Sequence, residues 1–159
     1  MGFQIRKPTT ADLPDLIVMI DELNLHEGEP TGHMTPDKAR HALFGDDPAL
    51  DAFVAEDEGR LIGFAFWHQS YETCYALRGG YVNDLYVRPA HRGAGVGKAL
   101  LQAAARAVAA RGGAFISLSA YRTNDNARAF YRHLMDVEDE NIIYYALTDE
   151  RFSRFCASD

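Results

Sequence analysis

Residues 92–97 constrain this chain most, because three glycines occur within five residues where one structural pattern changes into another. Residues 81–87 have the β-branched and aromatic content of a strand, whereas the residues after Gly97 are rich in Ala and Leu, as in a helix. Glycines at such a boundary let backbone N–H groups approach a ligand closely, and the helix directs its partly positive end to the same place. The segment therefore predicts a cradle for an anionic group.

Two common phosphate-binding patterns do not fit these glycines. A P-loop requires glycine where Arg92 stands and Ser or Thr where Ala99 stands. A dinucleotide-binding G-x-G-x-x-G places its third glycine at Lys98 or Leu100, and no acidic residue follows roughly 20 positions later to hold a ribose. A different anion-binding loop is required.

The charge distribution also favours an anionic ligand. The formal net charge is −7, yet residues 85–124 contain six basic residues and no Asp or Glu, so the rest of the chain sums to −13. A polyanionic ligand suits the basic part, and a cationic second substrate suits the acidic remainder. We expect Arg106 and Arg111 to belong to a solvated helix face, and the acidic composition disfavours nucleic acid as a partner. The six basic residues are Arg88, Arg92, Lys98, Arg106, Arg111 and Arg122.

Length and composition predict one globular domain over residues 1–159, with enough hydrophobic residues, 47%, to fill a core. No run of residues approaches a membrane span or the apolar core of a signal peptide, so we expect a cytoplasmic protein that does not bind membranes. Cys74 and Cys156 are far apart and the histidines form no ligand pattern, which predicts reduced thiols and no metal.

Periodicity predicts the order of elements. An amphipathic helix follows Thr9 and runs through Leu23, and the turn chemistry of residues 57–60 predicts a hairpin. Strands, first mostly antiparallel and then joined by a strand-helix-strand crossover, describe an α/β domain with a mixed sheet. The predicted strands are residues 3–7, 52–56, 61–71, 80–87, 114–120 and 141–147, and the further helices are residues 35–44, 95–111 and 125–134.

The loop fits the pattern [Q/R]-x-x-G-x-[G/A] at Arg92, Gly95 and Gly97, and it follows Val87 and Pro89. In this respect it resembles the pyrophosphate loop of the GNAT superfamily of acyl-CoA-dependent N-acyltransferases. The resemblance implies a mixed, mostly antiparallel central sheet with helices on both faces and a splayed pair of parallel strands. It also implies acetyl-CoA as the cosubstrate and no metal. The cofactor-binding loop would comprise Arg92, Gly93, Ala94, Gly95, Val96, Gly97 and Lys98.

A second motif strengthens the resemblance. Asn124 and Tyr131 lie seven residues apart on one predicted helix with Ala127 between them, so both side chains can face one cleft. In similar proteins the Asn holds the pantetheine arm with Ala127 in the same motif, and the Tyr lies near the thioester sulfur. A phenol can protonate the departing thiolate, which predicts Tyr131 as the general acid. The alternative is that Tyr131 packs with Phe130 in the core.

The strand before the loop has a further implied role, since in GNAT folds its exposed backbone pairs with the pantetheine amides. Leu85, Tyr86 and Val87 occupy that place. A backbone N–H of this strand would also stabilise the oxyanion of the tetrahedral intermediate.

The sequence leaves the general base open. Residues 80–87 most resemble the diamine acetyltransferases, in which Glu-Asp precedes the pantetheine strand, but Asn83 stands in place of the glutamate. Asn cannot accept a proton, so the candidates are Asp84 through an ordered water, an acid of the first helix such as Glu22 or Glu27, or solvent. Adjacent strand residues point to opposite faces, so Asp84 cannot simply take the missing glutamate's position.

Taken together, these residues predict an N-acetyltransferase that moves acetyl to a small amine or polyamine by direct attack. The alternatives are a protein amine as acceptor, or a non-catalytic acyl-CoA-binding regulatory module, which Asn83 favours. Met135 stands where the family usually has glycine, which predicts an altered acceptor-side loop, and the acidic residues 136–140 either gather cations or form a solvated turn. Diamine relatives are dimers, so a homodimer is a further expectation.

Overall fold

The computed structural model describes residues 2–157. Contacts divide the chain into two compact units, Met1–Ser119 and Ala120–Asp159, and each is described by itself.

A five-stranded sheet forms the first unit, in the order β1-β2-β3-β4-β5. The strands β1 (Gln4–Arg6), β2 (Asp51–Asp57), β3 (Arg60–Glu72) and β4 (Leu77–Val87) are antiparallel, and only β5 (Phe115–Leu118) runs parallel to its neighbour β4. A parallel pair requires a crossover, and the chain makes it through the helix α3 (Val96–Ala110). The predicted mixed, mostly antiparallel sheet is confirmed.

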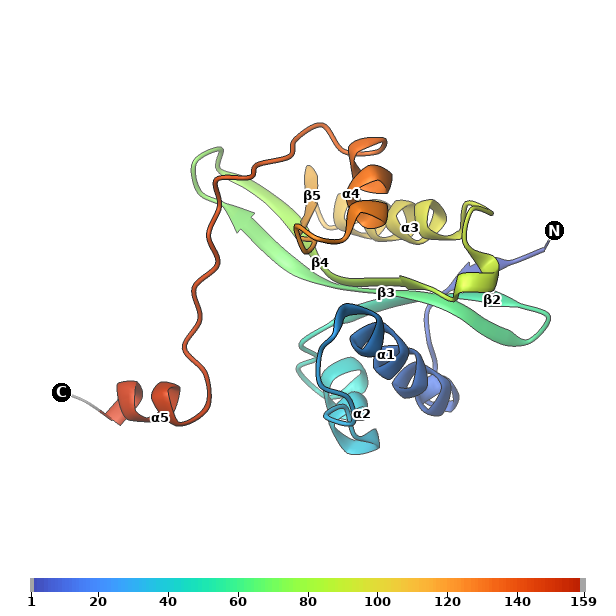
Figure 1. Ribbon diagram of the computed structural model, residues 1–159, viewed down its shortest axis with the longest axis horizontal. Coiled ribbons are helices and arrows are strands. Elements are labelled where there is room, and N and C mark those ends of the chain that lie inside the picture. Colours follow the sequence, from blue (N-terminus) through green and yellow to red (C-terminus); the bar gives the residue numbers. More distant parts are fainter. Residues whose placement is uncertain (1, 158–159) are drawn as a thin grey trace. The chain divides into compact units, whose positions relative to one another are not determined.

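Helices cover both faces of this sheet (Figure 1). The helices α1 (Leu13–Glu27) and α2 (Pro36–Phe44) lie on one face, where Leu16 and Met19 pack against Phe64 and Phe66. On the other face, α3 packs its Leu100 with strand residues that include Ile62 and Ala65. Strand side chains alternate between faces, so β3, from Leu61 to Trp67, supplies both cores and is buried throughout.

Local signals in the sequence place the helix ends. Pro36 occupies the first turn of α2, where its missing N–H is not needed, and the Thr35 hydroxyl accepts a hydrogen bond from the Lys38 N–H at 3.3 Å. Gly28 ends α1 in the left-handed conformation with φ of 77°. Short 3-10 turns precede α1 and follow β4, at Thr10–Asp12 and Pro89–His91.

The second unit contains the helices α4 (Asp125–Arg132) and α5 (Asp149–Ala157), and no residue from 120 to 157 is buried. Charge pairs hold α4 to the acidic residues that follow it: Arg128 and Arg132 donate to Glu138 at 2.9 and 2.5 Å, and Arg128 also bonds Glu140. These pairs lower the pKa of Glu138, chiefly through Arg132. The acidic run therefore neutralises neighbouring arginines of its own unit.

The predicted last strand is wrong. Residues 141–147 form no strand, and α5, which the sequence analysis did not predict, follows them. Ile142, Ile143, Tyr144 and Tyr145 have strand-like composition but are all more than 70% exposed. A strand exists only when a neighbour satisfies its backbone groups, and residues 141–147 join no ladder. Among residues 2–157, no helix has the length and apolar character needed to cross a bilayer.

Candidate active site

The two halves of β4 are paired differently. Gly79 to Val82 pair with β5 on one side and with β3 on the other, and the last β5 partner is Leu118, opposite Val82. From Asn83 to Val87, β3 is the one strand neighbour of β4 among residues 2–157. Pairing between the parallel strands therefore ends at Val82, and the β4 edge beyond it, the open edge, has no strand partner among residues 2–157.

Backbone alternation identifies which groups face this edge. The Arg88 N–H donates to the Ile62 carbonyl of β3 at 2.9 Å, so Tyr86 also directs its N–H and C=O to β3, while Leu85 and Val87 direct theirs outward. The Val87 carbonyl already accepts a hydrogen bond from Arg92 Nε at 2.8 Å. The Leu85 N–H and C=O and the Val87 N–H remain directed along the open edge.

The glycine loop connects this edge to α3. Gly93 and Gly95 have φ of 78° and 84°, a left-handed conformation that side chains resist. The first bond of α3 runs from the Ala99 N–H to the Gly95 carbonyl at 3.0 Å. The N–H groups of Val96, Gly97 and Lys98 therefore have no acceptor within the helix, as in other helix N-termini that bind anions. Ala94 lies between the two left-handed glycines, and the loop leads from the open edge into the first turn of α3.

A β-bulge falls at Asn83. Phe66 is opposite Asp84 and Trp67 is opposite Val82, so Asn83 has no partner residue across β3. Its Oδ1 lies 2.8 Å from Nδ1 of His68. The sequence alone gives no signal for His68, because 15 residues separate it from Asn83 and only the strand register brings the two together.

Two carboxyl groups, Asp84 beside the bulge and Glu27 of α1, have raised pKa values. Burial raises the pKa of Asp84. Loss of hydration, and then the charge of Asp84, raise the pKa of Glu27 at the end of α1. Glu22 is differently placed, since it forms an ion pair with Arg88 at 3.1 Å. The charge of Asp84 therefore acts on Glu27, whereas Glu22 is committed to its ion pair with Arg88.

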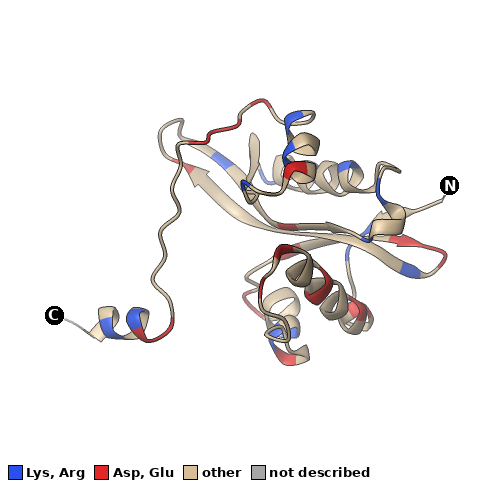
Figure 2. Cartoon of the chain, viewed as in Figure 1, with Lys and Arg blue, Asp and Glu red and all other residues tan. Residues whose placement is uncertain are grey.

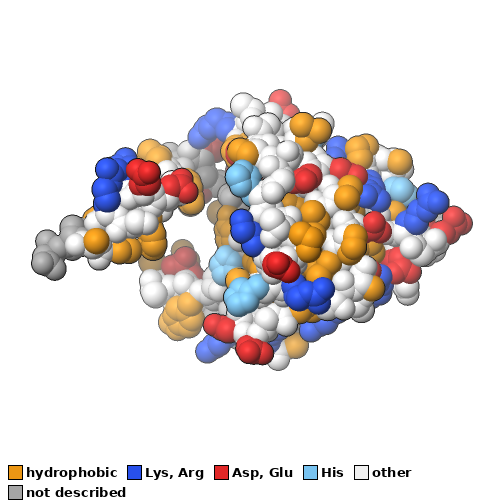
Figure 3. Space-filling model, turned by 90° about the horizontal axis from the view of Figure 1, so that it is seen from below, with side chains coloured by type: hydrophobic (Ala, Val, Ile, Leu, Met, Phe, Trp, Pro, Cys, Tyr) orange, Lys and Arg blue, Asp and Glu red, His pale blue; other side chains and the backbone are white. Residues whose placement is uncertain are grey.

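The surface around these groups is acidic on α1 and mixed elsewhere. The α1 sequence contains four acidic residues and no Lys or Arg, and Figure 2 shows them along the helix. The view from below (Figure 3) shows hydrophobic, acidic, basic and histidine side chains interspersed, without a field of one sign.

Acidic partners neutralise part of the basic stretch of residues 85–124. Arg111 forms an ion pair with Asp51 at 2.5 Å and lies over the Trp67 ring at 4.9 Å, and this carboxylate raises its pKa. Arg111 is exposed, as expected of a solvated face, but its charge is paired with Asp51. Arg88 and Arg122 also have acidic partners, Glu22 and Glu140.

Arg92 lies over the Tyr86 ring at 5.8 Å, next to the loop.

The second motif lies on α4 in the second unit. The Asn124 Oδ1 caps this helix by accepting the Ala127 N–H at 3.1 Å, which leaves its amide N–H groups as the donors for a ligand. Tyr131 lies in the last turn of α4, and its ring is 5.3 Å from that of Phe130.

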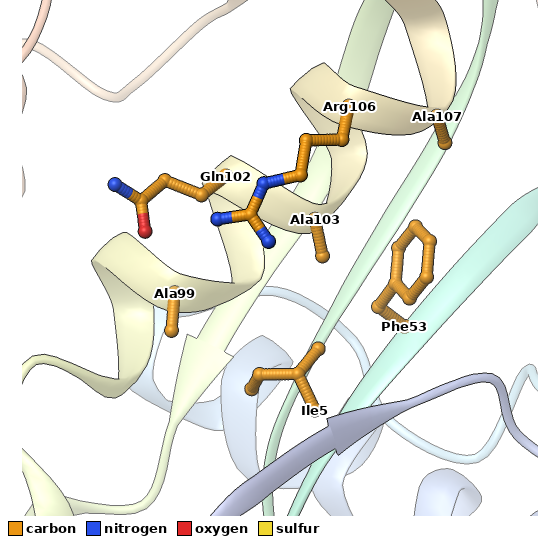
Figure 4. A pocket seen from close by; sticks show the side chains of 7 residues that line it. All are labelled: Ile5, Phe53, Ala99, Gln102, Ala103, Arg106 and Ala107. Atoms are coloured by element: carbon orange, nitrogen blue, oxygen red, sulfur yellow. The ribbon is translucent and has the colours of Figure 1, made fainter. Parts of the chain in front are cut away.

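An apolar groove of about 430 Å³ lies elsewhere, between α3 and the strands β1 and β2 (Figure 4). Phe53 and Ile5 form one side, and Gln102 and Arg106 of α3 form the other. It is separate from the open edge of β4.

The acetyltransferase (GNAT) family matches residues 17–135, which include the open edge, the glycine loop and α4. The chain belongs to the GNAT family. A thialysine N-epsilon-acetyltransferase of Mus musculus is 28% identical to this GNAT protein over 142 residues, covering 82% of each chain. A spermidine/spermine N(1)-acetyltransferase-like protein 1 of Homo sapiens is 30% identical over 108 residues, covering 63% of this chain and 15% of that protein. These matches identify the GNAT protein as an N-acetyltransferase.

Solved structures share the fold. An integron cassette protein from the mobile metagenome of V. cholerae aligns with a TM-score of 0.81 at 20% identity, covering 99% of each chain. An aminoglycoside acetyltransferase from an uncultured soil metagenomic sample, in complex with trehalose, aligns with a TM-score of 0.77 at 21% identity, covering 93% of the GNAT protein and 97% of that chain.

Proposed function

We propose that the chain, acting as one domain over residues 1–159, transfers acetyl from acetyl-CoA to a primary amine by direct attack. The observation that carries this proposal is the open edge of β4 running into the glycine loop. The Leu85 N–H and C=O and the Val87 N–H offer an extended ligand the pairing that β5 gives the first half of β4. The loop and the α3 N-terminus would bind the pyrophosphate.

Residues of this chain would supply the remaining catalytic groups. A backbone N–H at the open edge would stabilise the oxyanion of the tetrahedral intermediate. Asn124 would donate its amide N–H groups to the pantetheine arm, and the Tyr131 hydroxyl would protonate the departing thiolate. Asp84 and Glu27 would bind the positive charge of the incoming amine.

We propose a small amine or polyamine as the acceptor. The clustered carboxylates near the bulge and the acidic α1 favour a cationic substrate. Relatives named for thialysine and for spermidine/spermine acetylation are consistent with that class. A cytoplasmic location and a homodimer belong to the same proposal, and light scattering that gives a monomeric mass would refute the dimer.

The testing experiment measures release of the coenzyme A thiol from acetyl-CoA with spermidine, diamines, aminoglycosides and amino acids, alongside calorimetric binding of acetyl-CoA. We expect binding, and thiol release that depends on an added amine. Binding without turnover on any amine would favour a protein acceptor or a regulatory module. Absence of binding would refute the assignment of the glycine loop.

The variant Tyr131→Phe tests the acid. Loss of the phenolic proton should lower kcat by about 100-fold and leave the Kd for acetyl-CoA unchanged, since general acids contribute roughly 10²–10⁴-fold. The matched control is Tyr121→Phe, a variant of an exposed tyrosine in the same unit. An unchanged kcat would remove Tyr131 from the mechanism.

A further inference from the structure

We infer that His68, oriented by Asn83, is the general base that deprotonates the acceptor ammonium. The inference rests on the proposed function and assigns the group that the sequence leaves open.

The sheet register places His68 on the acceptor side of the reaction. Phe64 and Phe66 of β3 pack against α1, and alternation puts His68 on that same face. Asp84 is on this face as well, because Tyr86, two residues later, belongs to the same core. On this face of β3, His68 is therefore the next side chain after Phe66, the partner of Asp84, beside the point where the pairing of β4 with β5 ends.

The contact with Asn83 fixes the tautomer of the ring. Asn Oδ1 is an acceptor without a proton, so Nδ1 of His68, 2.8 Å away, must donate. In a neutral imidazole the other nitrogen, Nε2, then carries the lone pair. Asn83 cannot accept the ammonium proton itself, but it positions a neighbour that can.

A second contact holds the plane of the ring. The Tyr81 ring lies 5.5 Å from the imidazole centroid, and the Tyr81 hydroxyl is 2.7 Å from the Ser119 hydroxyl, just beyond the end of β5. His68 is half-buried, so it can contact a ligand while its orientation is restrained. A ring that is restrained and partly exposed can present Nε2 to a bound ammonium.

His68 and Tyr131 together account for every proton transferred in the reaction. Nε2 of His68 takes one proton from the ammonium, and the free amine attacks the thioester carbonyl carbon to form the C–N bond. The C–S bond breaks as the tetrahedral intermediate collapses, and the thiolate takes a proton from Tyr131, which regains one from the nitrogen of the intermediate. His68 finally releases its proton to solvent.

Other charged groups on this sheet face influence the pH profile. The charge of Asp84 acts on Glu27, whereas Glu22 forms an ion pair with Arg88 at 3.1 Å. The titratable and charged side chains on this face are Asp84 and Tyr81 of β4, Glu22 and Glu27 of α1, and Arg88 after β4.

The kinetic test compares His68→Gln with the wild type, using spermidine, a diamine and an aminoglycoside as acceptors from pH 7 to 9.5. Gln can still donate to Asn83, so the fold should be kept. We expect kcat/KM of His68→Gln to fall at least about 100-fold at pH 7. It should recover as the pH approaches the pKa of the acceptor ammonium, because the free amine then forms without a base. The Kd for acetyl-CoA should stay unchanged. The control His33→Gln removes an exposed imidazole from the loop before α2 and should behave as wild type.

A second measurement does not depend on turnover. Long-range ¹H–¹⁵N NMR should find Nδ1 protonated and Nε2 unprotonated in the neutral His68 ring, and Asn83→Ala should remove that preference and lower kcat. Nε2 protonated in the wild type would overturn the inference, as would a wild-type rate in His68→Gln. A wild type that acetylates none of the amines would refute the proposed function, while the NMR result would still decide the orientation of His68.

Discussion

The two halves of β4 have the same strand geometry but different partners. From Gly79 to Val82 each residue has strands on both sides, whereas from Asn83 to Val87 β3 is the one strand neighbour among the described residues. A bulge and the end of β5 coincide at this boundary. The first half of β4 therefore supports the fold, and the second half presents backbone groups to a ligand. Substitutions in the first half should change stability, and substitutions in the second half should change activity.

The largest effect is expected from Leu85→Pro. Proline removes an N–H that faces the open edge and bonds no residue of β3, so the ladder should survive. We expect kcat to fall by about 10²–10³, the effect of losing one oxyanion donor. Steady-state kinetics with Leu85→Ala, which keeps the N–H, supply the control, and equal rates in the two variants would refute the role of this backbone group.

The paired half should respond in stability instead. Val82 is 2% exposed, so Val82→Ala should lower the free energy of unfolding by about 1–3 kcal/mol through lost burial and a residual cavity. Urea denaturation would measure this loss, and kcat/KM should stay within about twofold of wild type below the transition. A large loss of kcat in the stable range would show that the two halves are not functionally separate.

The glycine loop should show a smaller effect on binding. Gly95→Ala forces a side chain into a left-handed conformation, which costs about 1–2 kcal/mol, and the strain should weaken acetyl-CoA binding about tenfold. Gly112→Ala is the matched control, because Gly112 has a similar φ of 79° beyond the opposite end of α3. Calorimetry should find weaker binding only for Gly95→Ala, and equal affinities would contradict a cradle at the loop.

The smallest effect concerns Asp84. Burial raises its pKa above the ordinary carboxyl value, so the folded state binds more protons than the unfolded state between the two values, and stability falls as pH rises through that window. Asp84→Asn removes the buried charge and should raise Tm at pH 7 by about 2–4 °C. Scanning calorimetry at pH 4 and pH 7 should show a smaller gain at the lower pH. The KM for the amine should rise, and a fall in Tm at pH 7 would contradict the buried-charge argument.

The sequence by itself determined the order of elements through α4 and the location of the loop. Glycines at a strand-to-helix boundary, Pro36 after Thr35, and apolar alternation are local signals, because each acts through backbone geometry or a neighbour within a few residues. They placed the strand that ends at Val87 and the helix α4 correctly. The same kind of signal failed for residues 141–147, because strand composition does not create a partner strand.

Tertiary structure alone decided which side chains meet. The 2.8 Å contact between His68 and Asn83, the effect of the Asp84 charge on Glu27, and the ion pair of Arg111 with Asp51 all join residues that are distant in the sequence. These contacts depend on helix packing and on sheet register, because one bulge changes the cross-strand partner of every later residue. The sequence therefore located the backbone that would bind acetyl-CoA, and only the folded sheet showed which neighbour stands beside the asparagine that replaces the expected glutamate.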